Sequence, residues 1–252
     1  MNGMLRCINA VCICYNLVMK KHVIFEKKEG KNKIQVADTF LDGEPVRICF
    51  CNGYMQSGIY LDEERKSELL FPYMRYFSYA FTIKEDIQSV LLIGGGTFSY
   101  PLYFLDHYRR MKLTVVEMNQ EMIDLAYTYF GLDDLDIEEK SNLTIIHEDA
   151  FQWLQTTEQK FDWIINDAFC GNEMMGRNVN SLNLIFSHLK SDGIYMENLV
   201  SSLKGPFKKS LVQEEELLNR YFTDITKIRS DDTMSLLAKQ NILLTCSGKK
   251  DI

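Results

Sequence analysis

Between residues 23 and 60, short apolar runs alternate with polar residues at a period of two. Clusters of Gly, Asn, Asp and Pro separate three such runs, at residues 23–25, 33–36 and 46–51. Period-two alternation between turn residues is typical of strands joined by hairpins. The pattern therefore predicts a small antiparallel sheet, and we expect residues 1–65 to form a small N-terminal β domain.

A helical pattern follows this expected sheet. From residue 62 to residue 81, the side chains of Leu69, Tyr73, Phe77 and Ala80 recur at helical spacing. Such spacing places apolar groups on one face of a helix. We therefore expect one helix to link the sheet to the rest of the chain.

Beyond Ser89, apolar strands alternate with helical segments. Strand-like runs occupy residues 90–93, 113–116, 143–146, 161–165 and 193–196, and helical patterns lie around 100–109, 120–130, 151–156, 181–190 and 206–221. Buried strands with helical crossovers form parallel, doubly wound sheets. Two last runs, 223–228 and 241–246, lack a full helix between them. We expect them to form an antiparallel pair that completes a seven-stranded sheet within an α/β domain of residues 66–252.

The composition excludes several classes of protein. The chain has 252 residues, 46% of them hydrophobic, with 28 basic and 35 acidic residues, which indicates a globular protein without the basic surface that nucleic acids require. Its seven cysteines show no C-x-x-C spacing, so we expect buried thiols in a reducing cytoplasm. The four histidines, His22, His107, His147 and His188, have no ligand spacing, so we expect no metal site.

The first 18 residues are apolar enough to suggest a signal peptide. They have no distinct basic region and no small-residue cleavage site, and Asn9 and Asn16 interrupt a run that is too short to span a bilayer. We interpret residues 1–18 as an extension or an extra strand. With no other long apolar run, we expect a cytoplasmic protein with no membrane contact.

Acidic residues stand at the ends of successive predicted strands. The first strand leads into Gly94, Gly95 and Gly96, and the next three lead to Glu117, Asp149 and Asp167. In doubly wound sheets, ligands bind at the carboxyl ends of the strands. A glycine turn alone is a weak signal, but three acids at successive strand ends predict a site for a nucleoside-type cofactor.

The spacing narrows the choice of cofactor. Glu117 follows the glycines by about twenty residues, the separation at which a carboxylate binds a ribose diol. Asp149 is placed for the adenine edge, and the small Ala150 leaves room for the ring. Ser99 stands where a dinucleotide site needs a third glycine, and no nearby Lys or Arg would bind a phosphate. We therefore expect S-adenosylmethionine or its decarboxylated form as co-substrate.

These residues resemble the spermidine synthase family, the polyamine aminopropyltransferases, from about Lys33 to the last strand. The matching motifs are Asn52-Gly-Tyr-Met-Gln56-Ser57, Phe71-Pro-Tyr73, Ile93-Gly-Gly-Gly96, Val116-Glu117, Asp149-Ala150 and Ile165-Asn-Asp167. The resemblance implies a Rossmann-like fold of the S-adenosylmethionine-dependent methyltransferase type and aminopropyl transfer to a polyamine, in a homodimer joined through the N-terminal sheet.

The same resemblance assigns roles to individual residues. It implies that Gln56, Glu117 and Asp149 hold the donor nucleoside. Asp167 would be the base on the acceptor side, and Tyr73 would line the acceptor tunnel. For Asp167, the residues also allow the simpler role of capping the following turn, and Tyr73 could be an ordinary core residue.

The chain departs from the family pattern at several positions. Thr97 stands where the family usually has an aspartate that pairs with the donor's aminopropyl ammonium, so we expect Thr97 to influence donor choice. Cys170 replaces the second carboxylate of the family's Asp-x-x-Asp. Residues 74–75 and 231–235 also differ from the usual polar or loop sequences. These departures predict a divergent, spermidine synthase-like member.

Three other functions remain open from the residues. A methyltransferase could use intact S-adenosylmethionine on the same fold, because a neutral Thr97 would not repel the donor's carboxylate. A non-catalytic protein could keep the adenosyl pocket without turnover, as the lost carboxylate at Cys170 would allow. A nicotinamide-dependent oxidoreductase is disfavoured by Ser99.

Overall fold

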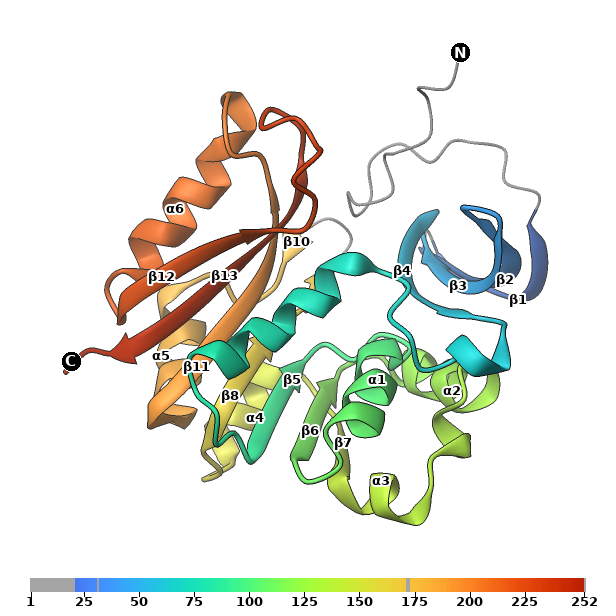
Figure 1. Ribbon diagram of the computed structural model, residues 1–252, viewed down its shortest axis with the longest axis horizontal. Helices are drawn as coiled ribbons and strands as arrows, with labels where there is room; N and C mark the ends of the chain where they lie inside the picture. Colours follow the sequence, from blue (N-terminus) through green and yellow to red (C-terminus); the bar gives the residue numbers. More distant parts are fainter. Residues whose placement is uncertain (1–20, 31, 171–172, 252) are drawn as a thin grey trace.

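The structure is a computed structural model that describes residues 21–30, 32–170 and 173–251. The expected N-terminal extension, residues 1–18, lies outside the described residues. Figure 1 shows a small antiparallel sheet beside a larger sheet that is covered by helices.

The N-terminal sheet has four antiparallel strands, which are β1 (His22–Glu29), β2 (Asn32–Leu41), β3 (Glu44–Cys51) and β4 (Tyr54–Tyr60). The two-residue turns at Asp42-Gly43 and Asn52-Gly53 have positive φ at both positions, which suits the tight hairpins of a twisted sheet. The expected antiparallel sheet is confirmed, and β4 is a strand that the sequence pattern did not predict.

The expectation of one helix over residues 62–81 is wrong. The segment contains two 3₁₀ helices, η1 (Glu63–Arg65) and η2 (Pro72–Thr82), with a loop between them. Pro72 begins η2, and Phe71 before it is extended, with φ −94° and ψ 111°. Because a proline disfavours helical geometry at the residue before it, a helix cannot pass through this point.

The larger sheet confirms the expected seven-stranded architecture. Its strand order is β12-β13-β11-β8-β5-β6-β7. The strands are β5 (Ser89–Ile93), β6 (Lys112–Glu117), β7 (Leu143–His147), β8 (Phe161–Asn166), β11 (Leu189–Ser201), β12 (Phe222–Arg229) and β13 (Gln240–Lys249). The central strands are parallel, and β13 pairs antiparallel with both β11 and β12. The order reverses at β5, where a ligand crevice is expected.

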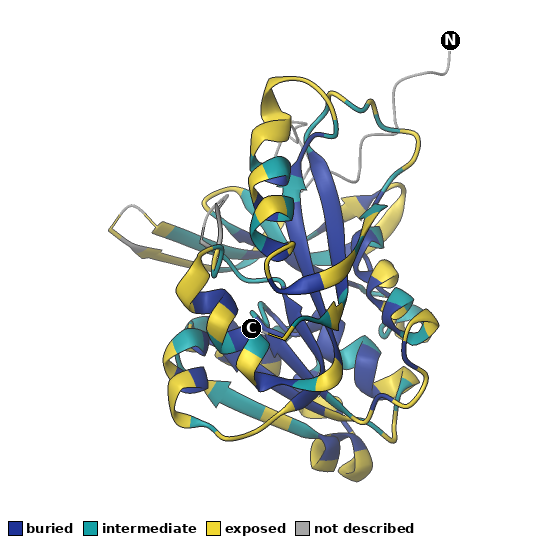
Figure 2. Ribbon diagram, turned by 90° about the vertical axis from the view of Figure 1, so that its left-hand side faces the viewer, coloured by how far each residue is buried: buried dark blue, intermediate teal, exposed yellow. Residues whose placement is uncertain are grey.

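Helices cover both faces of the larger sheet. On β5, Val90 and Leu92 pack in a core with η2, α1 (Ser99–His107) and α2 (Gln120–Tyr129), whereas Leu91 and Ile93 pack with α4 (Ala150–Thr156), α5 (Val179–His188) and α6 (Lys209–Leu218). Successive residues of a strand point to opposite faces, so this strand needs apolar residues throughout. Figure 2 shows the central strands buried between more exposed helices.

Five short elements complete the described chain; the last of them falls within the helical pattern expected at residues 206–221, and the first four were not predicted. They are η3 (Leu132–Asp134), α3 (Ile137–Asn142), β9 (Phe169–Cys170), β10 (Glu173–Met174) and η4 (Pro206–Lys208). Of these, β9 and β10 matter for the site because they form a small hairpin directly after β8.

The N-terminal sheet packs closely on the larger domain. Ile48 and Phe50 of β3 belong to the same buried cluster as Phe77 of η2 and Tyr100 of α1. On another side, Val36 and Ile59 pack with residues of α2. This shared core fixes β4 above the glycine-rich loop of the larger sheet. Among the helices that the structure describes, none is long and apolar enough to cross a membrane.

Candidate active site

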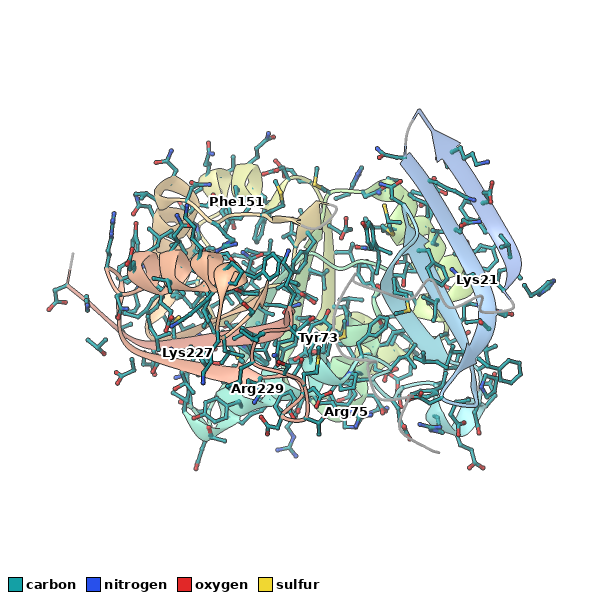
Figure 3. All side chains as sticks on the ribbon, turned by 90° about the horizontal axis from the view of Figure 1, so that it is seen from above. Lys21, Tyr73, Arg75, Phe151, Lys227 and Arg229 are labelled. Carbon is teal, nitrogen blue, oxygen red and sulfur yellow. The ribbon has the colours of Figure 1, made fainter. Side chains whose placement is uncertain are left out.

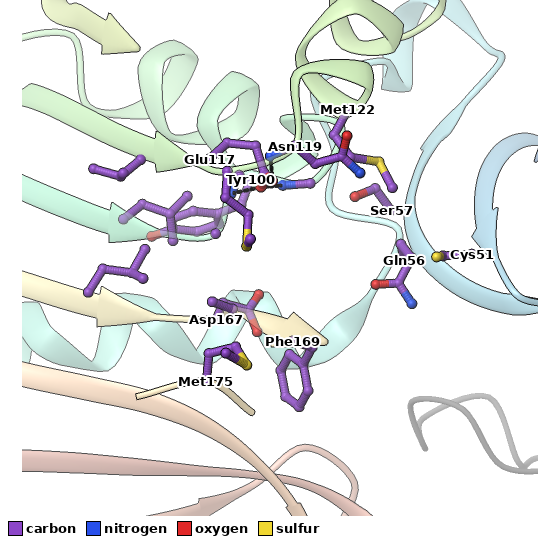
Figure 4. A pocket seen from close by; sticks show the side chains of 18 of the residues that line it. Cys51, Gln56, Ser57, Tyr100, Glu117, Asn119, Met122, Asp167, Phe169 and Met175 are labelled. Atoms are coloured by element: carbon purple, nitrogen blue, oxygen red, sulfur yellow. Dashed lines mark hydrogen bonds between the residues drawn. The ribbon is translucent and has the colours of Figure 1, made fainter. Parts of the chain in front are cut away.

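A cavity of about 910 Å³ lies at the carboxyl ends of β5, β6 and β8. Its walls include the glycine loop after β5, the end of β6, residues of β4 and the start of η2. Figure 4 shows Glu117 and Asp167 on either side of this space, with Gln56 and Ser57 beside it. The switch in strand order and the cavity therefore coincide, as expected for a ligand site in an α/β sheet.

The glycine loop is held in place by Glu117. One carboxylate oxygen, Oε2, accepts hydrogen bonds from the backbone N–H groups of Gly95 (2.9 Å) and Gly96 (3.0 Å). The other oxygen, Oε1, accepts from the backbone N–H of Asn119 at 2.9 Å. Glu117 is therefore an anchor for two loops, a role that the sequence analysis missed.

The surroundings of Glu117 also change its acidity. Burial raises the pKa of the Glu117 carboxyl above its usual range, although the backbone N–H donors act in the opposite direction. A ribose diol at this position would have to share acceptor oxygens that already bind the loop. The predicted contact between Glu117 and a ribose stays a prediction.

Two of the three glycines have a conformation that other residues rarely adopt. Gly94 has φ 89°, and a Cβ there would lie 2.8 Å from the Cα of Ala168. Gly96 has φ 52°, and a Cβ there would lie 2.6 Å from the Ser57 hydroxyl. The glycines thus let the loop pass close to both β4 and the chain after β8.

Thr97 does not lie where the sequence analysis expected it. Its backbone N–H donates to Oγ of Ser57 at 3.1 Å. Its side chain is fully buried and is not part of the cavity wall, and its hydroxyl has no hydrogen-bond partner among the described residues. The structure therefore does not bring Thr97 to a position from which it could contact a donor's tail.

Asp149 caps a helix at the far edge of the site. Its Oδ1 accepts from the backbone N–H groups of Phe151 (2.9 Å) and Gln152 (3.0 Å) at the start of α4. Asp149 and Ala150 both line the cavity. The predicted contact with an adenine stays a prediction, and the capping role explains independently why an acidic residue suits this position.

Asp167 lies at the centre of a small hydrogen-bonded group. Tyr73 donates its hydroxyl proton to Oδ2 of Asp167 at 2.8 Å, and the Asn198 amide donates to Oδ1 at 2.9 Å. Figure 3 shows Tyr73 in the middle of the molecule, between the N-terminal sheet and the antiparallel end of the larger sheet. Burial raises the pKa of the Asp167 carboxyl to about 6, which brings its titration close to neutral pH.

The structure unites predicted residues from both domains. Gln56 from β4, Tyr73 from η2, Glu117 from β6 and Asp167 after β8 all line one cavity. Asn198 is a site residue that the sequence analysis missed. It lies inside β11, which pairs with β8 and continues to Ser201, so the rule that placed the acids at strand ends did not point to it.

Most of the charged residues that line the cavity are acidic. The acidic ones are Glu117, Glu121, Asp124, Glu148, Asp149 and Asp167. Lys27 is the one cation among the described lining residues, and it forms an ion pair with Glu121. This charge distribution suits a cationic ligand without phosphate groups. Among the described residues, no cluster of His, Cys, Asp or Glu has the arrangement of a metal site.

The seven-stranded sheet, the glycine loop and the acidic cavity define a Rossmann-like protein with a site suited to a nucleoside. The family model described as the spermine/spermidine synthase domain matches residues 77–227, which is more than half of the chain. The chain therefore belongs to the spermine/spermidine synthase family.

Curated relatives agree with this assignment. A polyamine aminopropyltransferase of Hydrogenobaculum sp. (strain Y04AAS1) is 24% identical over 219 residues, which are 84% of this chain and 73% of that protein. Two further relatives match over smaller parts of their own lengths. They are a probable polyamine aminopropyl transferase, matched over 28% of its length, and a polyamine aminopropyltransferase, matched over 49%.

Solved structures show the same fold. A probable spermidine synthase from Corynebacterium glutamicum ATCC 13032 aligns with a TM-score of 0.72 and 21% identity, over 88% of this chain and 79% of that one. A spermidine synthase in complex with the transition state analogue AdoDATO aligns with a TM-score of 0.69 and 17% identity, over 92% of this chain and 76% of that one. At these identities, the likeness supports the fold.

Proposed function

We propose that this chain is an aminopropyltransferase that moves the aminopropyl group of decarboxylated S-adenosylmethionine to an amine. The observation that carries the proposal is the shared cavity of Glu117 and Asp167. Their strands, β6 and β8, flank β5, so their ends are about 10 Å apart at the usual spacing of strands. One ligand can therefore extend from one carboxylate to the other.

The relatives support this reaction over other reactions on the same fold. The curated relatives are named polyamine aminopropyltransferases, and a fold neighbour was solved with a transition state analogue. The case for intact S-adenosylmethionine depended on Thr97, which is buried away from the cavity wall. We keep a polyamine as the acceptor class, a homodimer as the assembly and the cytoplasm as the location within the same proposal.

The donor end would be formed by the acidic part of the cavity. Glu117 and Asp149 would face the nucleoside, with Gln56 beside them. The glycine loop permits close approach because Gly94 and Gly96 carry no side chain. A sulfonium ligand brings a positive charge, and the carboxylates of the wall would stabilise it.

Asp167 would prepare the acceptor nitrogen for attack. An ammonium has no lone pair, so it must first lose a proton, and Asp167 is the base placed to receive it. Tyr73 and Asn198 fix the carboxylate by hydrogen bonds at 2.8 and 2.9 Å. The freed nitrogen lone pair forms a bond to the carbon beside the sulfonium, and the carbon–sulfur bond breaks, leaving its electron pair on a neutral thioether. Alignment of the two reacting atoms is the larger contribution of the protein.

Calorimetric titrations test the donor assignment. We expect decarboxylated S-adenosylmethionine and methylthioadenosine to bind with one-to-one stoichiometry, and intact S-adenosylmethionine to bind more weakly. Absence of binding by all three adenosyl compounds would overturn the proposal. Tighter binding of intact S-adenosylmethionine, together with methyl transfer to an acceptor, would instead establish the methyltransferase.

A further inference from the structure

Two buried acidic residues lie outside the cavity described above. Glu197 of β11 and Glu214 of α6 have only 0% and 2% of their surfaces exposed, and neither lines the cavity. We propose that Glu197 is a positioning residue: its carboxyl group keeps a proton, shares it with Glu214, and thereby fixes residues 175–177 beside the cavity. This inference rests on the proposed function, because it assigns a residue that orders the wall of the same site.

The segment of residues 175–177 is held at its first residue by the end of β8. The side-chain amide of Asn166 donates to the carbonyl of Met175 at 2.9 Å, and the backbone N–H of Met175 donates to the carbonyl of Ala168 at 2.8 Å. Met175 lines the cavity, and Figure 4 shows it beside Asp167. The position of this segment therefore shapes the cavity next to the proposed base.

The other end of the segment is held by α6. The guanidinium of Arg177 forms an ion pair with Glu214, and its Nη2 donates to the carbonyl of Ser210 at 2.9 Å. Between the two ends, Gly176 lies so close to Phe151 that a Cβ would approach the ring to 2.2 Å. The segment therefore has a defined place as long as both of its ends are held.

Glu197 is connected with both ends of the segment. The Tyr195 hydroxyl donates to Oε2 of Glu197 at 2.8 Å. The same hydroxyl accepts a hydrogen bond of 3.3 Å from the Asn166 amide that holds Met175. On the other side, the charge of Glu214 acts on the Glu197 carboxyl. A change in the charge of Glu197 therefore reaches both ends.

Each of the two carboxyl groups has one oxygen that needs a partner. Oε1 of Glu197 and Oε1 of Glu214 are buried and have no hydrogen-bond partner among the described residues. Buried polar atoms are nearly always hydrogen-bonded, and two neighbouring carboxyl groups resist ionising together. One proton on Glu197, donated to Glu214, gives both oxygens a partner and removes one of the two negative charges.

The titratable groups around Glu197 favour this protonated state. Burial, and next the charge of Glu214, raise the pKa of the Glu197 carboxyl to about 8. Arg177 acts in the opposite direction, but its ion pair is with Glu214. Burial raises the pKa values of the Tyr195 hydroxyl and the Cys246 thiol well above their usual range, so both stay neutral. Glu197 therefore loses its proton only as the pH rises through about 8.

The pH profile of the proposed reaction tests the positioning role. Between pH 7 and pH 9, the KM of the original protein for 1,4-diaminobutane should rise at least about threefold more than that of Glu197→Gln. Glutamine has no proton to lose, and its amide can donate to Glu214 while its oxygen accepts from Tyr195. Tyr195→Phe should raise this KM already at pH 7. Glu216→Gln, at an exposed position of α6, is the matched control and should follow the original protein.

Two further measurements test the shared proton without turnover. Infrared spectra should show a protonated carboxyl group that is absent in Glu197→Gln and disappears from the original protein above about pH 8. In urea unfolding, the unfolded chain loses this proton at its ordinary pKa of 4.5. The contribution of Glu197 to stability is therefore present below pH 4.5 and is lost as the pH rises through about 8. The original protein should lose stability relative to Glu197→Gln over this interval.

The outcomes separate this inference from the proposed function. Absence of aminopropyl transfer by the original protein would count against the proposed function, and calorimetric titration of 1,4-diaminobutane over the same pH range would then replace KM. The same pH dependence of KM or affinity in the original protein and in Glu197→Gln would overturn the positioning role, as would absence of amine binding. If Glu197→Gln does not fold, a carboxyl signal of the original protein that is missing at pH 7 would overturn the inference.

Discussion

Replacing Asp167 by asparagine should change how the stability of the protein depends on pH. Burial raises the pKa of Asp167 from 3.8 to about 6. The folded protein therefore holds a proton that the unfolded chain has already lost over that interval. The contribution of the Asp167 carboxyl to the free energy of unfolding is fully present below pH 3.8, and it is lost as the pH rises through about 6.

The size of the effect follows from the shift in pKa. About two units correspond to roughly 3 kcal/mol of unfolding free energy, at about 1.4 kcal/mol per unit. Asparagine has no charge to bury, so it removes this dependence. Its amide can keep both neighbours if the Asn198 amide turns its unpartnered Oδ1 toward the new N–H donor, while the Tyr73 hydroxyl donates to the remaining oxygen.

Urea unfolding of both proteins between pH 4 and pH 7 measures the difference. We expect Asp167→Asn to gain up to about 3 kcal/mol relative to the original protein across this range, because all other titrating groups cancel in the comparison. Glu216→Gln, at an exposed position of α6, serves as the control and should follow the original protein. A constant difference between Asp167→Asn and the original protein would refute the burial argument for Asp167.

Three further variants test the glycine loop. Glu117→Gln should weaken methylthioadenosine binding by about 1.5–3 kcal/mol, the usual value for a hydrogen bond to a charged group; unchanged affinity in calorimetry would contradict the assigned donor end. Gly96→Ala should destabilise the protein by about 1–3 kcal/mol in urea unfolding, because it adds a strained φ and a Cβ only 2.6 Å from the Ser57 hydroxyl. The loss should be smaller in a Ser57→Ala background, and an equal loss would argue against this contact. Thr97→Val should preserve stability to within about 1 kcal/mol, since it removes a buried hydroxyl without a described partner; a changed donor preference would show that Thr97 does reach the ligand.

Much of the larger domain could be predicted because its strands are buried on both faces. Such strands are continuous apolar runs, and helices between them leave few possible arrangements. The acids at Glu117 and Asp167 were found by the same reasoning, because they directly follow these runs. Both the buried strands and the acidic residues that follow them can therefore be predicted from the local sequence.

The missed features depend on contacts between distant segments. Asn198 lies inside β11, which continues to Ser201 because β13 extends the pairing, so no strand end marks it in the sequence. Ser57 acquires its role only when β4 packs on a loop forty residues away. The inward position of Thr97 likewise depends on that contact and on the left-handed conformation of Phe98, with φ 64°.

Mass spectrometry of the reaction products tests the central claim most directly. The protein is incubated with decarboxylated S-adenosylmethionine and 1,4-diaminobutane. We predict equal amounts of methylthioadenosine and of an amine extended by one aminopropyl group, and neither product above background with Asp167→Asn. Methylthioadenosine without any extended amine, or full activity in Asp167→Asn, would contradict the account.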